Sequence, residues 1–423
     1  MKRVLIIALA MVLAACGGSQ KGNFSDPTDR LEVMSWWVSP SEHPALEVLL
    51  NAFKAQNPNV NVTDASIAGG AGSSVQVALA ARLRAGDPPD VWQTFVGSSL
   101  RAWVNASQIA DVSAVYERTK LAPTLPPTLR DAATFQGKQW GVPTGSHRGN
   151  VLWFNLKLLH DAGVAPPAAG YTPDAFNNDL AKVAANSRTP LCLGGKDRFT
   201  ATELFENTLL GVVGPDGWKK IGDDSFDWRG SQLREAITRF GQITSHVDPN
   251  AGGLTWDQAA KKLATGECAF LSMNDSVYGE LEANHVAEGK DFGYVTYPGT
   301  AGAYVAIIDT FVVSADAKDG INSLKFLDTV ANPKTTLEFN KLKGSVPVRN
   351  DVDVASLSVY QRQASDSLWH DKILLSITHG ELMPTNFQQA LYDAVATFMQ
   401  SKNADAFIDT LQNSIAVPLP GGR

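Results

Sequence analysis

The alternation of strand-like and helix-like segments over residues 31–97 is the feature that most restricts the fold. Leu31 and Val33 alternate with polar residues as in a half-buried strand, and the next segment, 45–58, has apolar residues at helical spacing. A glycine-rich strand region, a helix and a third strand follow, in the segments 57–72, 73–86 and 87–97. This βαβαβ order predicts an α/β fold, with a sheet covered by helices.

The pattern changes near residue 164, where a Pro-rich turn begins a second α/β region. Thr172 before Pro173 predicts the capped start of a helix there. With 423 residues, 44% of them apolar, the chain is long enough for two domains with separate cores. The net charge is −7, and Lys and Arg do not cluster beyond the first residues. We therefore expect no nucleic-acid partner.

The loop after the first strand carries two large rings and a carboxylate, Trp36, Trp37 and Glu42. Open α/β sheets bind ligands at the carboxyl ends of their strands, which is where this loop lies. A sugar matches these residue types, because its C–H face packs on an indole ring and its hydroxyls need a carboxylate or an amide. The alternative is that both rings fill a core, which requires both faces of the strand to be covered.

The first residues form an export signal, with a basic end at Lys2 and Arg3 before an apolar stretch. We expect residues 1–16 to be a signal whose last residue, Cys16, resembles the lipidated cysteine of a bacterial lipoprotein. The acyl chains would hold the mature protein at a membrane surface, with residues 17–30 as a flexible tether. The alternative is an ordinary signal cut near Ala15. Both alternatives predict a periplasmic or other extracytoplasmic location.

Two cysteines remain, Cys192 and Cys268, each in an apolar segment that is typical of a buried strand. An exported chain reaches an oxidising compartment, so the pair could form a disulfide. Two separately packed thiols are the alternative, and the sequence leaves both possibilities open.

The order of several motifs extends from residue 31 to the end of the chain. They are AGDPPDVWQ at 85–93, KQWGVP at 138–143, GECAF at 266–270, YPGT at 297–300, DTFVVS at 309–314 and LKGSVPVR at 342–349. Together with Trp36-Trp37 they resemble the extracytoplasmic solute-binding proteins of ABC sugar importers. The resemblance is to the glucose/galactose-binding branch of the maltose-binding-protein superfamily.

The resemblance implies a two-domain α/β fold of the type II periplasmic-binding class, with a hinge and an interdomain cleft. It places the N-terminal lobe in residues 31–139 and 305–345, and the C-terminal lobe in residues 140–304 and 346–423. The lobes would close on a ligand, since contacts on both of them favour the closed state.

The resemblance also predicts the ligand contacts. Gln93 would be an amide ligand, while Phe95 stands where relatives can have a polar histidine. Asp309 interrupts an apolar run, so it is either a paired buried charge or a pocket residue. Lys343 could instead be solvated, and His379 could be a helix C-cap. The full predicted sugar-binding set is Trp36, Trp37, Glu42, Gly69, Gly70, Gln93, Trp256, Asp309, Lys343 and His379.

From this we expect the substrate-binding component of an ABC transporter, a monomer that needs no cofactor or metal. It would capture a monosaccharide, glucose first and galactose or mannose next, and deliver it to a membrane permease. One alternative is an exported glycoside hydrolase or lyase, with Glu42 and Asp309 as acid and base. The other keeps the receptor fold and changes the ligand to a disaccharide or another polar solute.

Overall fold

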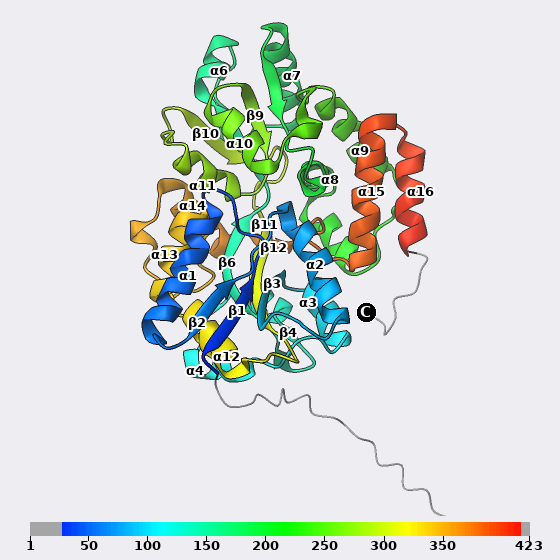
Figure 1. The fold of residues 1–423 in the computed structure, drawn as a ribbon. Helices are drawn as coiled ribbons and strands as arrows, with labels where there is room; N and C mark the ends of the chain where they lie inside the picture. The colour runs from blue at the N-terminus through cyan, green and yellow to red at the C-terminus, as the bar shows by residue number, and fades with distance from the viewer. Residues whose placement is uncertain (1–27, 416–423) are drawn as a thin grey trace, which may run out of the picture.

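Two β-sheets with their own helices divide the chain, as Figure 1 shows for the computed structural model, which describes residues 28–415. The larger sheet has the strand order β12-β11-β3-β1-β2, with β6 also paired to β11. The smaller sheet has the order β10-β7-β9-β8. We call the parts built on the larger and the smaller sheet the first lobe and the second lobe.

The first lobe contains the strands β1 (Arg30–Met34), β2 (Asn61–Asp64), β3 (Val91–Phe95), β6 (Val142–Arg148), β11 (Ala303–Val313) and β12 (Lys372–Leu375), and the hairpin β4 (Thr134–Phe135) and β5 (Lys138–Gln139). Its helices are α1 (Glu42–Gln56), α2 (Ser73–Arg84), α3 (Ser98–Asn105), α4 (Ser113–Thr119), α5 (Pro127–Ala132), α12 (Gly320–Val330), α13 (Pro333–Lys343) and α14 (Val359–His370). Short 3₁₀ turns lie at η1 (Gly70–Gly72), η2 (Ala122–Thr124) and η4 (Val354–Ser356).

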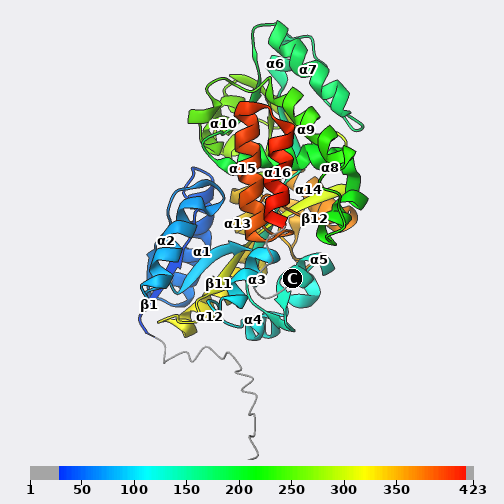
Figure 2. The ribbon, with the colours of Figure 1, turned by 90° about the vertical axis from the view of Figure 1, so that its right-hand side faces the viewer.

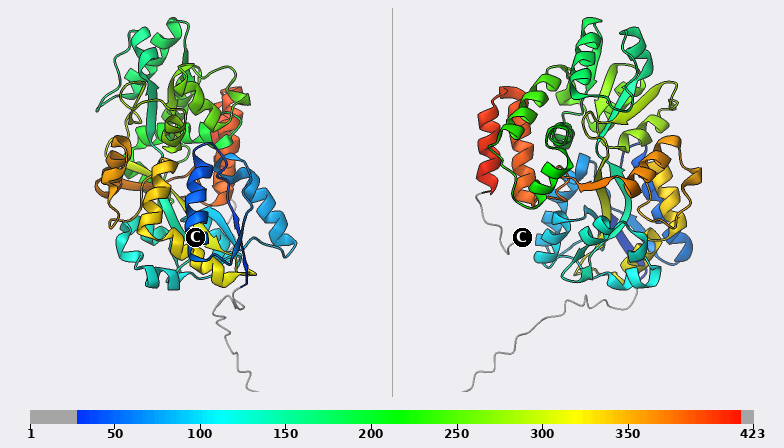
Figure 3. Two further views of the ribbon diagram at one scale, coloured as in Figure 1. Left: turned by 60° about the vertical axis from the view of Figure 1, so that its left-hand side comes forward. Right: turned by 180° about the vertical axis from the view of Figure 1, so that it is seen from behind.

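The second lobe contains the strands β7 (Val151–Asn155), β8 (Thr189–Cys192), β9 (Cys268–Ser272) and β10 (Phe292–Thr296). Its helices are α6 (Leu156–Asp161), α7 (Pro173–Ala185), α8 (Arg198–Gly222), α9 (Ser231–Thr244), α10 (Trp256–Ala264), α11 (Ser276–Ala283), α15 (Thr385–Ser401) and α16 (Ala404–Ile415), with the turn η3 (Ala251–Gly253). Figure 2 shows α15 and α16 side by side next to α8, and Figure 3 shows the same pair from behind.

Burial explains why these segments fold as they do. α1 buries Leu46, Leu49, Leu50 and Phe53, which recur at helical spacing along one face. β11 is buried over its whole length, as expected of a strand covered on both faces, so its sequence is an apolar run instead of an alternation. The predicted mixed α/β fold is confirmed.

The chain crosses between the lobes more than once. It leaves the first sheet after β6, enters the second at β7, and returns from β10 to β11. β6 and β12 belong to the first sheet, although the predicted boundaries assign residues 140–304 and 346–423 to the C-terminal lobe. Both strands pair with β11, the strand that the chain enters when it returns to the first sheet.

A disulfide joins Cys192 at the end of β8 to Cys268 at the start of β9, with 5.8 Å between the Cα atoms. The two strands are parallel neighbours. Of the two possibilities that the sequence leaves open, the structure therefore contains the bonded one.

The predicted signal, Cys16 and most of the predicted tether lie outside the described residues. Within residues 28–415, none of the helices combines the length and the apolar character needed to cross a membrane.

Candidate functional site

A cavity of about 490 Å³ lies between the two lobes. The parallel strands β1 and β3 of the first sheet, and β8 and β9 of the second, lead into the loops that surround it. This is the position at which open α/β sheets bind ligands. The lining includes Trp36, Trp37, Glu42, Gly69, Gly70, Phe95, Asp309 and Lys343 from the first lobe, Asp197, Phe199, Trp256, Asn274 and Ser276 from the second, and His147 and His379 from segments close to the crossings.

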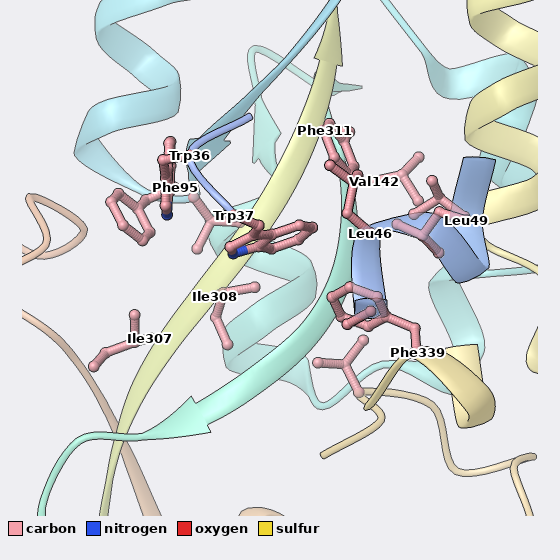
Figure 4. Packing of buried hydrophobic residues seen from close by; sticks show 14 of the residues in the cluster. Trp36, Trp37, Leu46, Leu49, Phe95, Val142, Ile307, Ile308, Phe311 and Phe339 are labelled. Atoms are coloured by element: carbon pink, nitrogen blue, oxygen red, sulfur yellow. The ribbon is translucent and has the colours of Figure 1, made fainter. Parts of the chain in front are cut away.

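The two tryptophans after β1 point in different directions, as Figure 4 shows. The Trp36 ring lies 5.2 Å from Phe95, centroid to centroid, whereas the Trp37 ring packs on Phe311 and Phe339 in the core. Trp37 still reaches the cavity, and within the described part of the chain its buried Nε1 has no hydrogen-bond acceptor. Trp37 is therefore a core ring that also borders the cavity.

The backbone of Gly72 packs against the Trp36 ring. Gly72 has φ +76°, and a Cβ added to it would come within 2.6 Å of the Trp36 ring. The glycine cluster after β2 therefore permits a close approach of backbone to an aromatic wall.

A cluster of paired charges forms one wall. Lys343 Nζ lies 3.0 Å from Glu42 Oε1 and 3.0 Å from His147 Nε2, and it donates to Ser276 Oγ. His147 Nδ1 bonds Asp275 Oδ1 at 2.5 Å. Since Lys343 and His147 belong to the first lobe and Asp275 and Ser276 to the second, this cluster also links the lobes.

Asp309 is held from two sides. Gln93 Nε2 donates to Asp309 Oδ1 at 2.7 Å, and His147 Nε2 lies 3.4 Å from Oδ2. Burial acts to raise the pKa of Asp309, but the interactions with His147, Lys343 and Gln93 outweigh it, so the pKa is lowered. Asp309 is therefore a charged acceptor at neutral pH.

The other groups of this wall are shifted by the same competition. Burial raises the pKa of Glu42, and the opposing effect of Lys343 does not fully cancel it. Burial and Lys343 lower the pKa of His147, but Asp275 and Asp309 outweigh them and raise it. The wall thus contains both charge signs in direct contact, and this arrangement suits hydroxyl groups that both donate and accept.

His379 faces the cavity beside Phe95, 5.1 Å from it between ring centroids. Its Nδ1 lies 3.0 Å from Ser376 Oγ. Burial lowers the pKa of His379 to about 3, so the ring is neutral at physiological pH. A neutral imidazole can donate or accept, according to its tautomer.

Asp197 is a cavity residue that the sequence analysis missed. It precedes α8, where an aspartate is typical of an N-cap, yet its side chain does not cap that helix. Its Oδ2 accepts from the backbone N–H of Trp256 at 2.8 Å, and its carboxylate also lies against Gly70, where an added Cβ would come within 2.9 Å of Oδ1. Burial raises the pKa of Asp197. The only signal in the sequence was its place after a strand, in LCLGGKD.

The structure brings the predicted set together, with one member set back. Gln93 lies behind the wall, where it positions Asp309 and accepts from Ser35 Oγ at 2.6 Å. The others line the cavity: Trp36, Trp37, Glu42, Gly69, Gly70, Trp256, Asp309, Lys343 and His379. Among residues 28–415, no group of His, Cys, Asp or Glu side chains is arranged to hold a metal ion.

Comparison with known proteins gives one consistent family. The family described as bacterial extracellular solute-binding protein matches residues 39–336. An uncharacterised ABC transporter extracellular-binding protein of Pyrococcus horikoshii is 26% identical over 97% of this chain and 93% of its own length. A probable sugar-binding periplasmic protein of Brucella suis is 28% identical over 93% of this chain and 94% of its own length.

Solved structures confirm the predicted two-domain solute-receptor fold. A bacterial solute receptor described as having an exclusive preference for β-D-galactopyranose superimposes with a TM-score of 0.79. The superposition covers 91% of this chain and 97% of that one, at 16% identity, and so concerns the fold alone. Because the family match covers most of this chain, the chain belongs to the bacterial extracellular solute-binding proteins.

Proposed function

We propose that this protein captures a monosaccharide in the cavity between its lobes and delivers it to the membrane subunits of an ABC importer. The observation that carries the proposal is the pairing of aromatic rings with charged hydrogen-bonding groups in one cavity. Trp36 of the first lobe and Trp256 of the second line it, together with Asp309 and Lys343. The sugar-binding relative in Brucella suis supports a carbohydrate ligand.

The ionic groups of the cavity favour a neutral sugar. Lys343 is already bonded to Glu42, and Asp309 to Gln93 and His147. A ligand with its own charge would have to compete with these pairs, whereas a hydroxyl can add to them. Trp37 Nε1, which has no acceptor within residues 28–415, offers a further donor. Glucose is the first candidate, and galactose or mannose the next.

Closure of the lobes is part of the proposal, with the hinge in the segments that cross between them. Trp36, Trp37, Glu42 and Asp309 would meet the sugar first, and Trp256 and His379 would complete the enclosure. The closed form would be the one that the permease recognises. Only a ligand that contacts both lobes shifts this equilibrium.

Isothermal titration calorimetry tests the proposal. The mature protein isolated after export is titrated with glucose, galactose, mannose, xylose and maltose. A dissociation constant at or below about 1 μM for one hexose supports it. If maltose alone binds, the ligand is a disaccharide, and if none binds, the sugar assignment fails.

The same preparation, incubated with aryl glycosides, tests the enzymatic alternative. We expect no release of the aglycone, and its release would contradict the receptor function and favour the glycoside hydrolase. Membrane attachment through Cys16 is tested by incorporation of labelled fatty acid, which Cys16→Ser should abolish.

A further inference from the structure

Two carboxylates of the second lobe reach across to the backbone of the first lobe, on opposite sides of the cavity. Asp197 lies against Gly70, where an added Cβ would come within 2.7 Å of Asp197 Cγ, and Glu280 Oε1 accepts from Ser41 N at 3.1 Å and from Ser41 Oγ at 2.7 Å. The turn η1, which contains Gly70, contacts α8, and Figure 1 shows α2 and α8 on one side of the molecule and α1 and α11 on the other.

Asp197 is fixed within its own lobe before it touches the other. In the preceding loop, Gly195 N donates to Ala251 O and Lys196 N donates to Leu254 O, both at 2.9 Å. The N–H of Trp256 then donates to the Asp197 carboxylate at 2.8 Å. The carboxylate therefore moves with the second lobe, and its contact with Gly70 depends on the position of the first lobe.

Glycines allow the lobes to approach at both contacts. A Cβ on Gly70 would come within 2.7 Å of Asp197 Cγ, although Gly70 does not need the left-handed region of φ. On the other side, a Cβ on Gly279 would lie 2.9 Å from Lys343 O and 3.1 Å from Ser41 Cβ. At both contacts the lobes can therefore approach closely because a side chain is missing.

Each carboxylate also lies close to the start of a helix of the opposite lobe. Ser41 is the residue before α1, and Gly70 lies in the short turn that leads into α2. The exposed N–H groups and the dipole at a helix start attract an anion. On each side of the cavity, a carboxylate of the second lobe thus faces the start of a helix of the first lobe.

We propose that Asp197 and Glu280 are a pair of closure residues, which hold the two lobes together through protein contacts alone. The inference rests on the proposed closing motion and adds two residues that stabilise the closed state relative to the open state. Because every partner is part of the chain, these contacts stabilise the closed arrangement whatever sugar is bound. They are positioning residues, and a sugar supplies only the remaining preference for the closed form.

Hydrogen exchange of the mature protein, followed by mass spectrometry without added sugar, tests this pair. In Asp197→Ala we expect exchange to accelerate at least tenfold in peptides that contain Gly70, and also in peptides that contain Ser41. In Glu280→Ala the same two regions should respond. The reciprocal effect distinguishes opening of the lobes from the loss of one local bond, since two contacts that stabilise one state are coupled in both directions.

Two controls keep the result interpretable. Asp257→Ala removes another carboxylate of the cavity, one that bonds Thr255 within the second lobe, and should leave exchange at Ser41 unchanged. Peptides from the core strand β3 should keep the wild-type exchange in every variant, and Asp197→Asn and Glu280→Gln, which retain an acceptor oxygen, should give smaller effects than the alanine variants.

If each alanine variant accelerates exchange only at its own partner, or if neither does, the inference is wrong. Acceleration throughout β3 in the alanine variants would mean general unfolding. The Asn and Gln variants would then decide whether both contact regions respond together or each responds alone. Since no sugar is present, these results are independent of the calorimetric test of the proposed function.

Discussion

Two groups of buried carboxylates lie close to the crossing segments, and they are stabilised in different ways. At the cavity, Asp309 and Glu42 contact His147 and Lys343, which are basic groups. Behind it, three glutamates are satisfied mainly by N–H and hydroxyl donors: Glu203 by Asn274, Glu206 by Ser376 and Ile377, and Glu381 by Ile308 and Ser376.

The pKa values follow this difference. The pKa of Asp309 is lowered despite complete burial, whereas burial raises the pKa of Glu206 to about 7 and those of Glu203 and Glu381 well above the ordinary value. Neutral donors reduce the cost of burying a carboxylate, but a basic partner is needed to keep it charged. Of these five carboxylates, Asp309 is therefore the one held as an anion that can bind hydroxyls, whereas burial still raises the pKa of Glu42 against the effect of Lys343.

The largest effect is expected when the cation at the cavity is removed. Lys343→Met keeps the length of the side chain but leaves Glu42 buried without its partner. We expect the free energy of unfolding to fall by about 3–5 kcal/mol, as when one member of a buried pair is lost, and sugar binding to be lost with it. Urea denaturation measures the first and calorimetry the second.

The matched control is Lys341→Met, which changes an exposed lysine on the same helix. It should leave stability and binding close to those of the wild type. An unchanged stability for Lys343→Met would show that Glu42 is protonated in the folded protein. Lys343 would then not be the partner that keeps this carboxylate charged.

Glu206→Gln tests the second group of carboxylates, whose pKa values are raised by burial. Between the unfolded pKa of 4.5 and the folded value of about 7, the folded protein holds a proton that the unfolded chain has lost. The free energy of unfolding therefore falls as the pH rises through this window. Relative to Glu206→Gln, the wild type should lose about 3 kcal/mol of stability between pH 4.5 and 8.

Urea titrations of both proteins across that pH range measure the difference, in which titration of the other groups cancels. Glu47→Gln, an exposed glutamate on α1, is the control for the loss of a carboxylate. A difference that stays constant with pH would mean that Glu206 remains charged without a cation.

Asp309→Asn should give a dependence of the opposite sign. The folded pKa of Asp309 is lowered, so its contribution is present above the ordinary pKa and disappears as the pH falls. At neutral pH we expect the variant to be less stable than the wild type by about 1.5–3 kcal/mol, the usual range for a charged hydrogen bond, and this gap should shrink in acid. Asp316→Asn, exposed after the end of β11, is the control. A gap that widens in acid would contradict the assignment.

Local patterns predicted much of this molecule. The βαβαβ order was confirmed, and Thr172 accepts from Ala175 N at the start of α7, as its place before Pro173 indicates. Asp309 could be selected because a charge inside an apolar strand needs a partner. These predictions depend on spacing along the chain, which the sequence contains.

Contacts between distant segments could not be predicted in this way. The sequence does not show that β6 and β12 both pair with β11, because strand pairing is decided by the tertiary fold. It also could not place Gln93 behind Asp309, since both a ligand and a supporting amide fit the same position. Asp197 was missed because an aspartate before a helix is normally a cap.

The smallest expected effect concerns the Trp37 indole nitrogen, which we propose as a donor to the sugar. Trp37→Phe removes the buried Nε1, which has no acceptor among the described residues. The lost packing and the relief of an unpaired donor oppose each other, so stability should change by less than about 1 kcal/mol. Affinity for the bound sugar should fall by about three- to tenfold, as for one neutral hydrogen bond.

Trp92→Phe is a close control, because its Nε1 is also buried without a partner in the described chain, but away from the cavity. Calorimetry should separate the two variants, and equal affinities would mean that Trp37 serves only the core.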